Sequence, residues 1–373
     1  MIKKIISLIS LLLAIVICTG CWDQRPIKDR MLINGLGFDI NQDHKIELNA
    51  SILNIIGKGT GAFDLENELI TTEANSVVDA GIKVQTVLPG GIETAKTRLF
   101  LLGEDFAKEK FQFILDQFNR TPFTNVNVNV VITNKQKAKD ILELETLNRP
   151  ISFVINETVD RAKRISIIPN IDLQKIYTMV TEIGIDILLP VVDKTKDEHV
   201  GVLGAGLFHK GSYTGKFIEK SEAPILLMMM DQFNNTSLFV TRIQNKSSAE
   251  APYNIISYEL RRPSREFIVH ASKNKIDVDI PIKAKIRIGE STNIQHISEK
   301  EIKSIIEKDL NKRAKIVIKE AQQANSDVLG VGRYIKEHNP KLWKSLDWDK
   351  KYPTIQVHPR FNIYISNTGI LET

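Results

Sequence analysis

The stretch KIDVDIPIKAKIRIG, Lys275–Gly289, alternates apolar and polar residues along almost its whole length. Successive side chains of a strand point to opposite faces, so this pattern separates the isoleucines from the charged residues. One buried and one solvated face is typical of a strand in an antiparallel sheet. Neighbouring stretches alternate similarly between short polar turns: VGVLGAGLFHKG, SYTGKFIE, SLFVTRI, YNIISYELRR and REFIVHAS. We therefore predict that residues 200–373 form an antiparallel-sheet domain.

One long helix is predicted after this strand. Ser298 and Glu301 have the spacing of a capping box, and Ile297 and Ile302 lie where a hydrophobic staple closes. A helix from there to Asn325 would be roughly 40 Å long at about 1.5 Å per residue, so we expect it to lie across the sheet. The stretch TIQVHPRFNIYIS then supplies the last strand. An apolar stripe at helical spacing supports the helix: Ile302, Ile305, Ile306, Leu310, Val317 and Ala321.

The preceding part of the exported chain is predicted to be a ββαβαβ domain over residues 21–145. Its first two strands are MLINGLGFDI and KIELNASILNI, and we expect GKGTGAFDLEN after them to be a loop. A helix follows from Ala74 and ends before Pro89, since apolar residues recur there at helical spacing. TRLFLL is the next strand, a second helix starts at Gly103, and NVNVNVVI is the last strand. This order predicts a sheet with helices packed against it.

Residues 146–199 are predicted to form a mainly helical middle segment. The helical pattern covers residues 151–183 with a break at Ile168–Asn170, and the strand IDILLPVV leads out of it. The charged stretch Asp193–His199 is the expected boundary before the last domain. The chain as a whole is therefore predicted to be a multidomain α+β protein, with mixed and antiparallel sheets and packed helices.

The beginning of the chain carries an export signal. A positively charged start precedes the apolar run Ile5–Ile17, which is short for a membrane-spanning helix and typical of a secretory signal peptide. Small residues then lead to Cys21, in a pattern that resembles the lipobox of bacterial lipoproteins, although Cys18 stands where such boxes usually have Leu. We predict that residues 1–20 are removed and that Cys21 carries a diacylglyceryl anchor.

Other interpretations of these two cysteines are less favoured. A redox C-x-x-C belongs in a folded βαβ unit, and a structural zinc site needs two further Cys or His ligands. The chain has no other cysteine, and Cys18 would leave with the signal. An uncleaved signal anchor remains the main alternative to lipid attachment at Cys21.

Composition and motifs give little sign of catalysis or of nucleic-acid binding. The net charge is +5, and 42% hydrophobic and 25% charged residues are ordinary for a globular protein. The seven histidines are scattered, and no G-x-S-x-G motif occurs. GSYTGKF departs from a phosphate-binding loop and is interpreted as a hairpin turn, while the methionines of LLMMMDQF are interpreted mainly as core. We therefore predict no catalytic residue, no cofactor, no metal and no nucleic-acid partner.

Both ends of the exported chain resemble one family. GCWDQR, Gly20–Arg25, is similar to the start of the Ger(x)C family, the lipoprotein C subunits of bacterial spore germinant receptors, although Pro26 replaces the acidic residue common there. INGLGFDI resembles the first strand of that family. The stretch SDVLGVGRYIKEHNPKLWKSLDWDKKYPTIQVHPRFNIYISNTG resembles its end. The residues that fit in this last stretch are Asp327, Gly330, Gly332, Pro340, Trp343, Trp348 and Gly369.

The resemblance implies a non-enzymatic, three-domain lipoprotein on the outer face of the spore inner membrane. It would act in nutrient-triggered germination with an integral membrane A subunit and a permease-like B subunit. Trp343 and Trp348 are expected to be packing anchors, and Gly330 and Gly332 to meet backbone requirements. The alternatives are a solute-binding lipoprotein of a membrane transporter, which should have two similar α/β lobes around a cleft, and an anchored hydrolase.

Overall fold

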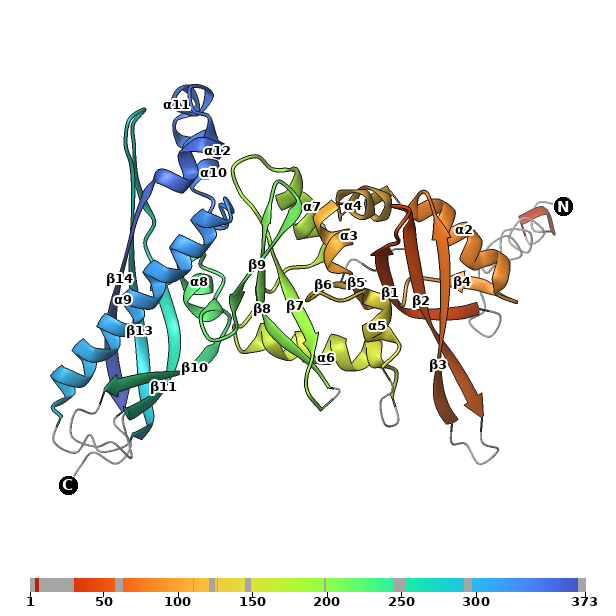
Figure 1. Ribbon diagram of the computed structural model, residues 1–373, viewed down its shortest axis with the longest axis horizontal. Helices are drawn as coiled ribbons and strands as arrows, with labels where there is room; N and C mark the ends of the chain where they lie inside the picture. Colours follow the sequence, from red (N-terminus) through yellow and green to blue (C-terminus); the bar gives the residue numbers. More distant parts are fainter. Residues whose placement is uncertain are drawn as a thin grey trace.

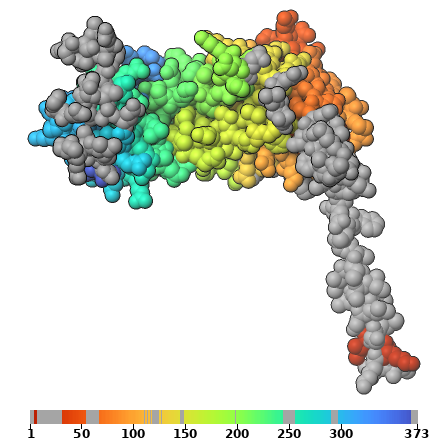
Figure 2. Space-filling model, turned by 90° about the horizontal axis from the view of Figure 1, so that it is seen from below, coloured from red at the N-terminus to blue at the C-terminus, as the bar shows by residue number. Residues whose placement is uncertain are grey.

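The computed structural model describes residues 4–6, 30–57, 63–109, 111–120, 125, 127–144, 149–197, 199–244, 253–291 and 297–367. These residues form an elongated body around two sheets, which follow one another along its long axis (Figure 1). Figure 2 shows the same order from below, with the sequence colours running along the body. Among the helices that the structure describes, none is both long and apolar enough to cross a bilayer.

The first sheet is mixed. It contains nine strands: β1 (Arg30–Ile40), β2 (Ile46–Gly57), β3 (Phe63–Ala74), β4 (Gly91–Glu93), β5 (Leu99–Leu102), β6 (Asn129–Thr133), β7 (Leu188–Lys194), β8 (Val200–His209) and β9 (Ser212–Glu219). The strands β3, β2 and β1 form an antiparallel meander, and β5, β6 and β7 continue it parallel to β1. The hairpin β8–β9 then pairs antiparallel with β7 and ends the sheet, while β4 pairs with the beginning of β1.

Helices cover both faces of the first sheet because its central strands are apolar on both sides. In β5, Leu99 and Leu101 pack in one cluster, while Phe100 and Leu102 pack in the other. The side of Phe100 is covered by α2 (Val77–Val87), α3 (Glu104–Glu109), α4 (Phe111–Arg120) and α7 (Leu173–Thr181). The side of Leu99 is covered by α5 (Ala138–Leu142) and α6 (Ile151–Arg164), which lie below the sheet in Figure 1.

In the part of the chain that the structure describes, the second sheet has helices on one face only. Its five strands are β10 (Thr236–Gln244), β11 (Tyr253–Arg265), β12 (Ile268–Ala271), β13 (Ile276–Ser291) and β14 (Gln356–Asn367). The inner face packs on α8 (Ala223–Met229) and α9 (Glu299–Gln323). Two side chains of α9 also close the edge of β14, because Asn311 and Glu307 accept the N–H groups of Phe361 and Ile363 at 3.0 Å each. The long helix therefore both covers and terminates this sheet.

A series of short helices connects α9 to β14. They are α10 (Val331–His338), α11 (Pro340–Lys344), α12 (Trp348–Lys351) and the 3₁₀ turn η2 (Tyr352–Thr354). The local sequence patterns did not predict these helices. They turn the chain back beside the first sheet before it enters β14 (Figure 1).

The predicted fold class is confirmed, and most of the predicted elements are present. The break at Ile168–Asn170 separates α6 from α7, and the capping box of α9 is formed by Ser298 and Glu301. Met228, Met229 and Met230 are buried, as the core interpretation predicts, and the Gly211 region is a hairpin turn with φ of 76° at that glycine. The proposed division into three domains stays a prediction.

Three details of the sequence prediction are wrong. Residues 63–67 of the predicted loop belong to β3, which continues to Ala74 and pairs with β2 along its whole length. The hairpin β8–β9 belongs to the first sheet, not to the antiparallel sheet of the second half, because β8 pairs with β7. The last strand, β14, lies parallel to β13, because the intervening helices carry the chain back to the end of the sheet where β13 begins.

The capping box of α9 leads to a stability prediction. Ser298→Ala removes the hydroxyl that accepts the N–H of Glu301 at 3.3 Å, and the loss of such a cap costs about 1 kcal/mol. Chemical denaturation of residues 22–373 should show a fall in unfolding free energy of that size. Ser304→Ala, inside the same helix, is the control and should be neutral or slightly stabilising because Ala favours helices more than Ser. Equal stability of the two variants would contradict the role of the cap.

Candidate functional site

A cavity of about 670 Å³ lies where the first sheet meets the short helices α10–α12. On one side are residues 180–187, from the end of α7 to the start of β7, and the turn 209–211 of the hairpin β8–β9. On the other side are Asp327 and residues 343–349. We call the contact between residues 182–211 and residues 326–352 the seam. It joins segments far apart in the chain and contains several buried polar groups.

Asp327 is the centre of the seam. It is only 2% exposed, and it lies in the short connection between the end of α9 at Gln323 and the start of α10. One carboxylate oxygen accepts the N–H of Val331 at 3.0 Å, and the other accepts the N–H of Gly332 at 2.7 Å. That second oxygen also accepts the indole N–H of Trp348 at 3.2 Å. The carboxylate thus holds the start of α10, where helix N–H groups lack partners of their own, and fixes the tryptophan of α12.

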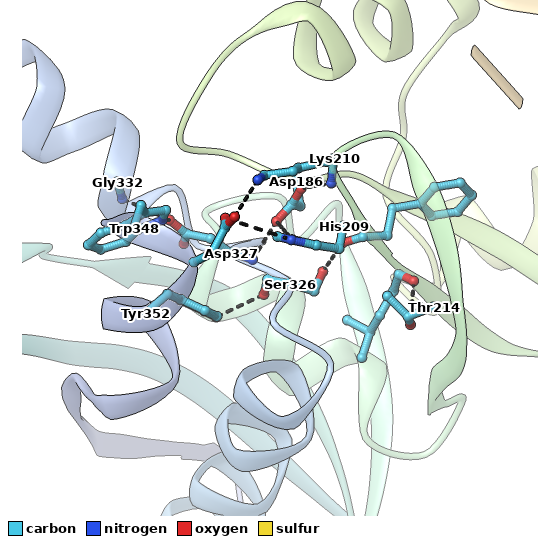
Figure 3. A network of polar contacts seen from close by, with 12 residues as sticks. Asp186, His209, Lys210, Thr214, Ser326, Asp327, Gly332, Trp348 and Tyr352 are labelled. Atoms are coloured by element: carbon cyan, nitrogen blue, oxygen red, sulfur yellow. Dashed lines mark hydrogen bonds and ion pairs between the residues drawn. The ribbon is translucent and has the colours of Figure 1, made fainter. Parts of the chain in front are cut away.

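Asp186 connects Asp327 to the first sheet. Its backbone N–H donates to the Asp327 carbonyl at 3.0 Å, and the Asp327 N–H donates to Oδ2 of Asp186 at 2.8 Å. The other oxygen, Oδ1, accepts the N–H of Lys210 at 2.8 Å. A further backbone bond crosses the seam from Arg333 N to Gly184 O at 2.7 Å. Figure 3 shows Asp327 between Trp348 and Gly332 on one side and Asp186, His209 and Lys210 on the other.

Charged side chains continue this network towards the cavity. Nδ1 of His209 lies 3.6 Å from Oδ2 of Asp186, and its Nε2 lies 3.8 Å from Oδ1 of Asp349. Lys210 forms an ion pair with Asp349. His209 therefore lies between two carboxylates from opposite sides of the seam, an arrangement that favours its protonated form.

Backbone groups at the bottom of the seam are bonded as well. The Ser326 hydroxyl donates to the carbonyl of Phe208, and the hydroxyl of the fully buried Tyr352 donates to the carbonyl of Ser326 at 2.8 Å. Both contacts connect the end of α9 to a neighbour far away in the sequence (Figure 3). Such bonds satisfy polar groups that would otherwise be costly to bury.

Burial changes the titration of the seam. It raises the pKa of the Asp327 carboxyl to about 7, because desolvation outweighs the N–H donors of Gly332 and Val331 and the charge of Asp186 adds to the rise. The Asp186 carboxylate raises the pKa of His209, against the effect of partial burial. Both shifts favour proton uptake at the seam as the pH falls through neutrality.

A second buried carboxyl group, that of Asp39, lies in the first sheet but away from the seam. It is on β1, whereas the seam adjoins β7, and these are the two outer strands of the parallel part. Asp39, at the end of β1, accepts the N–H groups of Ala138 at 2.7 Å and Lys139 at 3.0 Å, at the start of α5. Asn49 donates to it at 3.0 Å. Burial raises the pKa of Asp39 to about 6, against those backbone donors. This carboxyl fixes α5 against the sheet, within one half of the molecule rather than between halves.

The expected roles of two glycines and two tryptophans are confirmed. Gly330 has φ of 71°, a left-handed conformation that favours glycine. A Cβ on Gly332 would lie 2.7 Å from ring atoms of Trp348 and 3.0 Å from the Cα of Gly184. The rings of Trp343 and Trp348 pack with centroids 5.5 Å apart. The sequence analysis identified these residues, but not Asp186, His209 or Tyr352, which carry no local motif.

Other residues singled out from the sequence lie elsewhere. Cys21, the predicted lipid attachment site, lies outside the described residues, as do Trp22, Asp23, Arg25 and Gly369. Within the described ranges, no three His, Cys, Asp or Glu side chains are placed to hold a metal ion. The absence of metal, cofactor and catalytic residues in the whole chain stays a prediction.

The close approach at Gly332 predicts a loss of stability on substitution. Gly332→Ala would place a methyl group against Trp348, so it should cost about 1–3 kcal/mol of unfolding free energy, the usual range for overpacking. Gly81→Ala is the matched control: its Cβ would have no neighbour within 4 Å, inside α2. This change should stabilise the protein by about 0.5–1 kcal/mol because Ala favours helices. Denaturation midpoints that move equally would contradict the close packing at the seam.

The raised pKa of Asp327 predicts a distinctive pH dependence. Because the folded state holds a proton up to pH of about 7 while the unfolded carboxyl has a pKa near 3.8, stability should increase as the pH falls between these values. Between pH 7 and 5.5 the gain from this group is about 2 kcal/mol. Asp327→Asn removes the titrating group and with it this gain. As the pH falls from 7 to 5.5, the unfolding free energy of the wild type should therefore rise by this amount relative to that of the variant. Parallel pH profiles would contradict it.

Comparisons with known proteins show what the chain is similar to. The model of the spore germination protein N-terminal domain matches residues 23–194, and that of the spore germination B3/GerAC-like C-terminal domain matches residues 203–369. Spore germination protein KC of Bacillus subtilis is 22% identical, with 99% of this chain and 97% of the relative covered. Spore germination protein A3 of the same organism is 24% identical, with 96% and 97% covered.

A solved structure supports the fold. The crystal structure of the GerBC protein matches with a TM-score of 0.54 at 19% identity, covering 89% of this chain and 97% of the other. The two family models together span nearly all of the chain after its signal-like start, with their junction in the charged stretch before β8. The chain therefore belongs to the GerAC-like, or Ger(x)C, family of spore germination proteins.

Proposed function

We propose that this chain is the non-enzymatic C subunit of a spore germinant receptor. In this role it acts with an integral membrane A subunit and a permease-like B subunit in nutrient-triggered germination. The observation that carries the proposal is the match of both family models, over residues 23–194 and 203–369, together with relatives named as spore germination proteins along their whole length. The expected division into three domains belongs to the same proposal.

The proposal includes a lipid anchor on Cys21 and a position at the outer face of the spore inner membrane. Two acyl chains on one cysteine give stable attachment, whereas a single chain is only marginal. From Cys21 to Arg30, where β1 begins, the chain can reach about 30 Å at ~3.3–3.6 Å per residue. An anchor of this length would keep the first sheet close to the bilayer and to partners embedded in it.

The architecture favours a receptor subunit over a solute-binding lipoprotein. A solute-binding protein is expected to have two similar α/β lobes around a cleft. Here the two halves differ, since the first sheet is mixed with helices on both faces and the second has helices on one face. At the seam, the carboxylate of Asp327 bonds with Val331 and Gly332 on its own side, and the carboxylate of Asp186 accepts the Asp327 N–H across the junction. That arrangement suits a rigid subunit that passes a change of position from one half to the other.

Replacement of the anchor residue tests the proposal. Cys21→Ala should abolish lipid attachment and cleavage after Gly20 without changing the fold from β1 onwards. Fractionation of mutant spores should show that the protein is no longer in the membrane fraction. Germination through this receptor should fall sharply because the subunit is no longer concentrated at the membrane.

Cys18→Leu is the control for the loss of a thiol near the cleavage point. Cys18 is expected to leave with the signal, so this variant should be lipidated and should germinate as the wild type does. Normal germination of spores whose Cys21→Ala protein demonstrably lacks lipid would contradict the proposed route to the partners.

A further inference from the structure

The second sheet has one face that no helix of the described residues covers. Its inner face packs on α8 and α9, so alternate residues of its strands point the other way. We call this other side the outer face. Six of its side chains are cationic and at least partly exposed: Arg242, Arg261, Lys283, Lys285, Arg287 and Arg360.

The outer face carries an excess of positive charge. Lys283, Lys285 and Arg287 follow one another along one side of β13, and the strand register sets Arg261 directly opposite Lys285. Glu259 lies 2.5 Å from Arg261 and 3.1 Å from Arg287, so one carboxylate serves two guanidinium groups. Within the described residues, Lys285 and Arg242 make no ion pair. Lys283 pairs with Glu266 at 4.0 Å and Arg360 with Asp279 at 3.6 Å. The face therefore presents two cations, Lys285 and Arg242, that no carboxylate of the described residues neutralises.

Exposed apolar side chains lie next to these cations. On β10, at the edge of the sheet, Leu238 is 82% exposed and Val240 is 50% exposed. The register places Leu238 opposite Glu259 of β11, which lies opposite Arg287 of β13. Ile255 of β11 is 38% exposed on the same face, opposite Arg242. Exposed apolar side chains that lie together are costly to hydrate. An apolar cluster bordered by cations is therefore typical of a surface that binds a protein or a membrane.

We propose that the outer face lies against the anionic headgroups of the membrane to which the chain is attached. Cations attract a negatively charged leaflet, and leucine and valine side chains among them can enter the boundary between headgroups and acyl chains. A protein partner would need acidic and apolar groups in matching positions, whereas an anionic bilayer offers charged headgroups and acyl chains over its whole surface. The lipid surface accounts for both features.

Such a contact would fix the orientation of an elongated protein. The inference rests on the proposed anchor, which precedes β1 in the first sheet, whereas the outer face lies in the second sheet at the other end of the body (Figure 1). An anchor at one end alone leaves the body free to swing. A second contact at the far end holds it along the membrane, with the seam between the two points.

The test uses the full chain, anchored through its own lipid in vesicles of phosphatidylcholine with or without phosphatidylglycerol. A fluorophore is attached at Val240→Cys on the outer face or at Lys312→Cys on the exposed side of α9. Lipids with nitroxide-labelled headgroups quench fluorophores at the membrane surface. We expect strong quenching at position 240 and weak quenching at 312, only in vesicles with phosphatidylglycerol, and loss of the difference at high salt.

Charge variants complete the test. Each basic residue near an anionic surface strengthens binding about fivefold, so Arg242→Gln with Lys285→Gln should lower the ratio of surface-bound to free orientations roughly 25-fold. Lys308→Gln with Lys319→Gln on α9 removes the same charge and should leave the quenching at position 240 unchanged.

The outcomes separate this inference from the proposed function. A chain that does not remain with the vesicles at all contradicts the anchor. A vesicle-bound chain with equal quenching at 240 and 312 overturns the outer-face contact while the anchor stands. Protection of position 240 only in a complex purified with protein partners also overturns it, and assigns the face to an acidic protein surface.

Discussion

Buried Asp327 is the residue on which the junction of the two halves depends. It accepts N–H groups from Val331, Gly332 and Trp348, while its backbone exchanges hydrogen bonds with Asp186. Burying a carboxyl is costly, as its raised pKa shows, so its position is set by donors that the fold supplies. Without the carboxylate, the start of α10 and the ring of Trp348 would lose their bonds to Asp327, whose backbone is bonded in turn to Asp186 on the side of the first sheet.

This constraint explains why the residues around it are so specific. Gly332 must lack a side chain for Trp348 and Gly184 to approach, and Gly330 must adopt a positive φ for α10 to begin. In the proposed receptor, a rigid seam would let the two halves move as one body. An anchor at the beginning of the chain and a lipid contact on the outer face would then set the position of that body relative to its membrane partners.

Local patterns made much of the fold predictable. The apolar run of β5, the alternation of β13 and the capping box at Ser298 each specify an element from adjacent residues. β3 was missed because its polar residues resemble a loop and only pairing with β2 makes them a strand. The hairpin β8–β9 could not be assigned to a sheet from its own sequence. In the seam, Asp327 and Gly332 stood out by family resemblance, but Asp186 and His209 become partners only through tertiary contacts.

The central claim is that this chain works as one subunit of a membrane receptor. The most direct measurement is to purify it from detergent-solubilised spore membranes and to identify, with their stoichiometry, the proteins that remain bound. The account predicts an integral membrane protein and a permease-like protein, each in a fixed ratio to this chain, corresponding to the A and B subunits. Stoichiometric recovery of the components of a solute importer instead, or of this chain alone under conditions that keep other receptors intact, would contradict it.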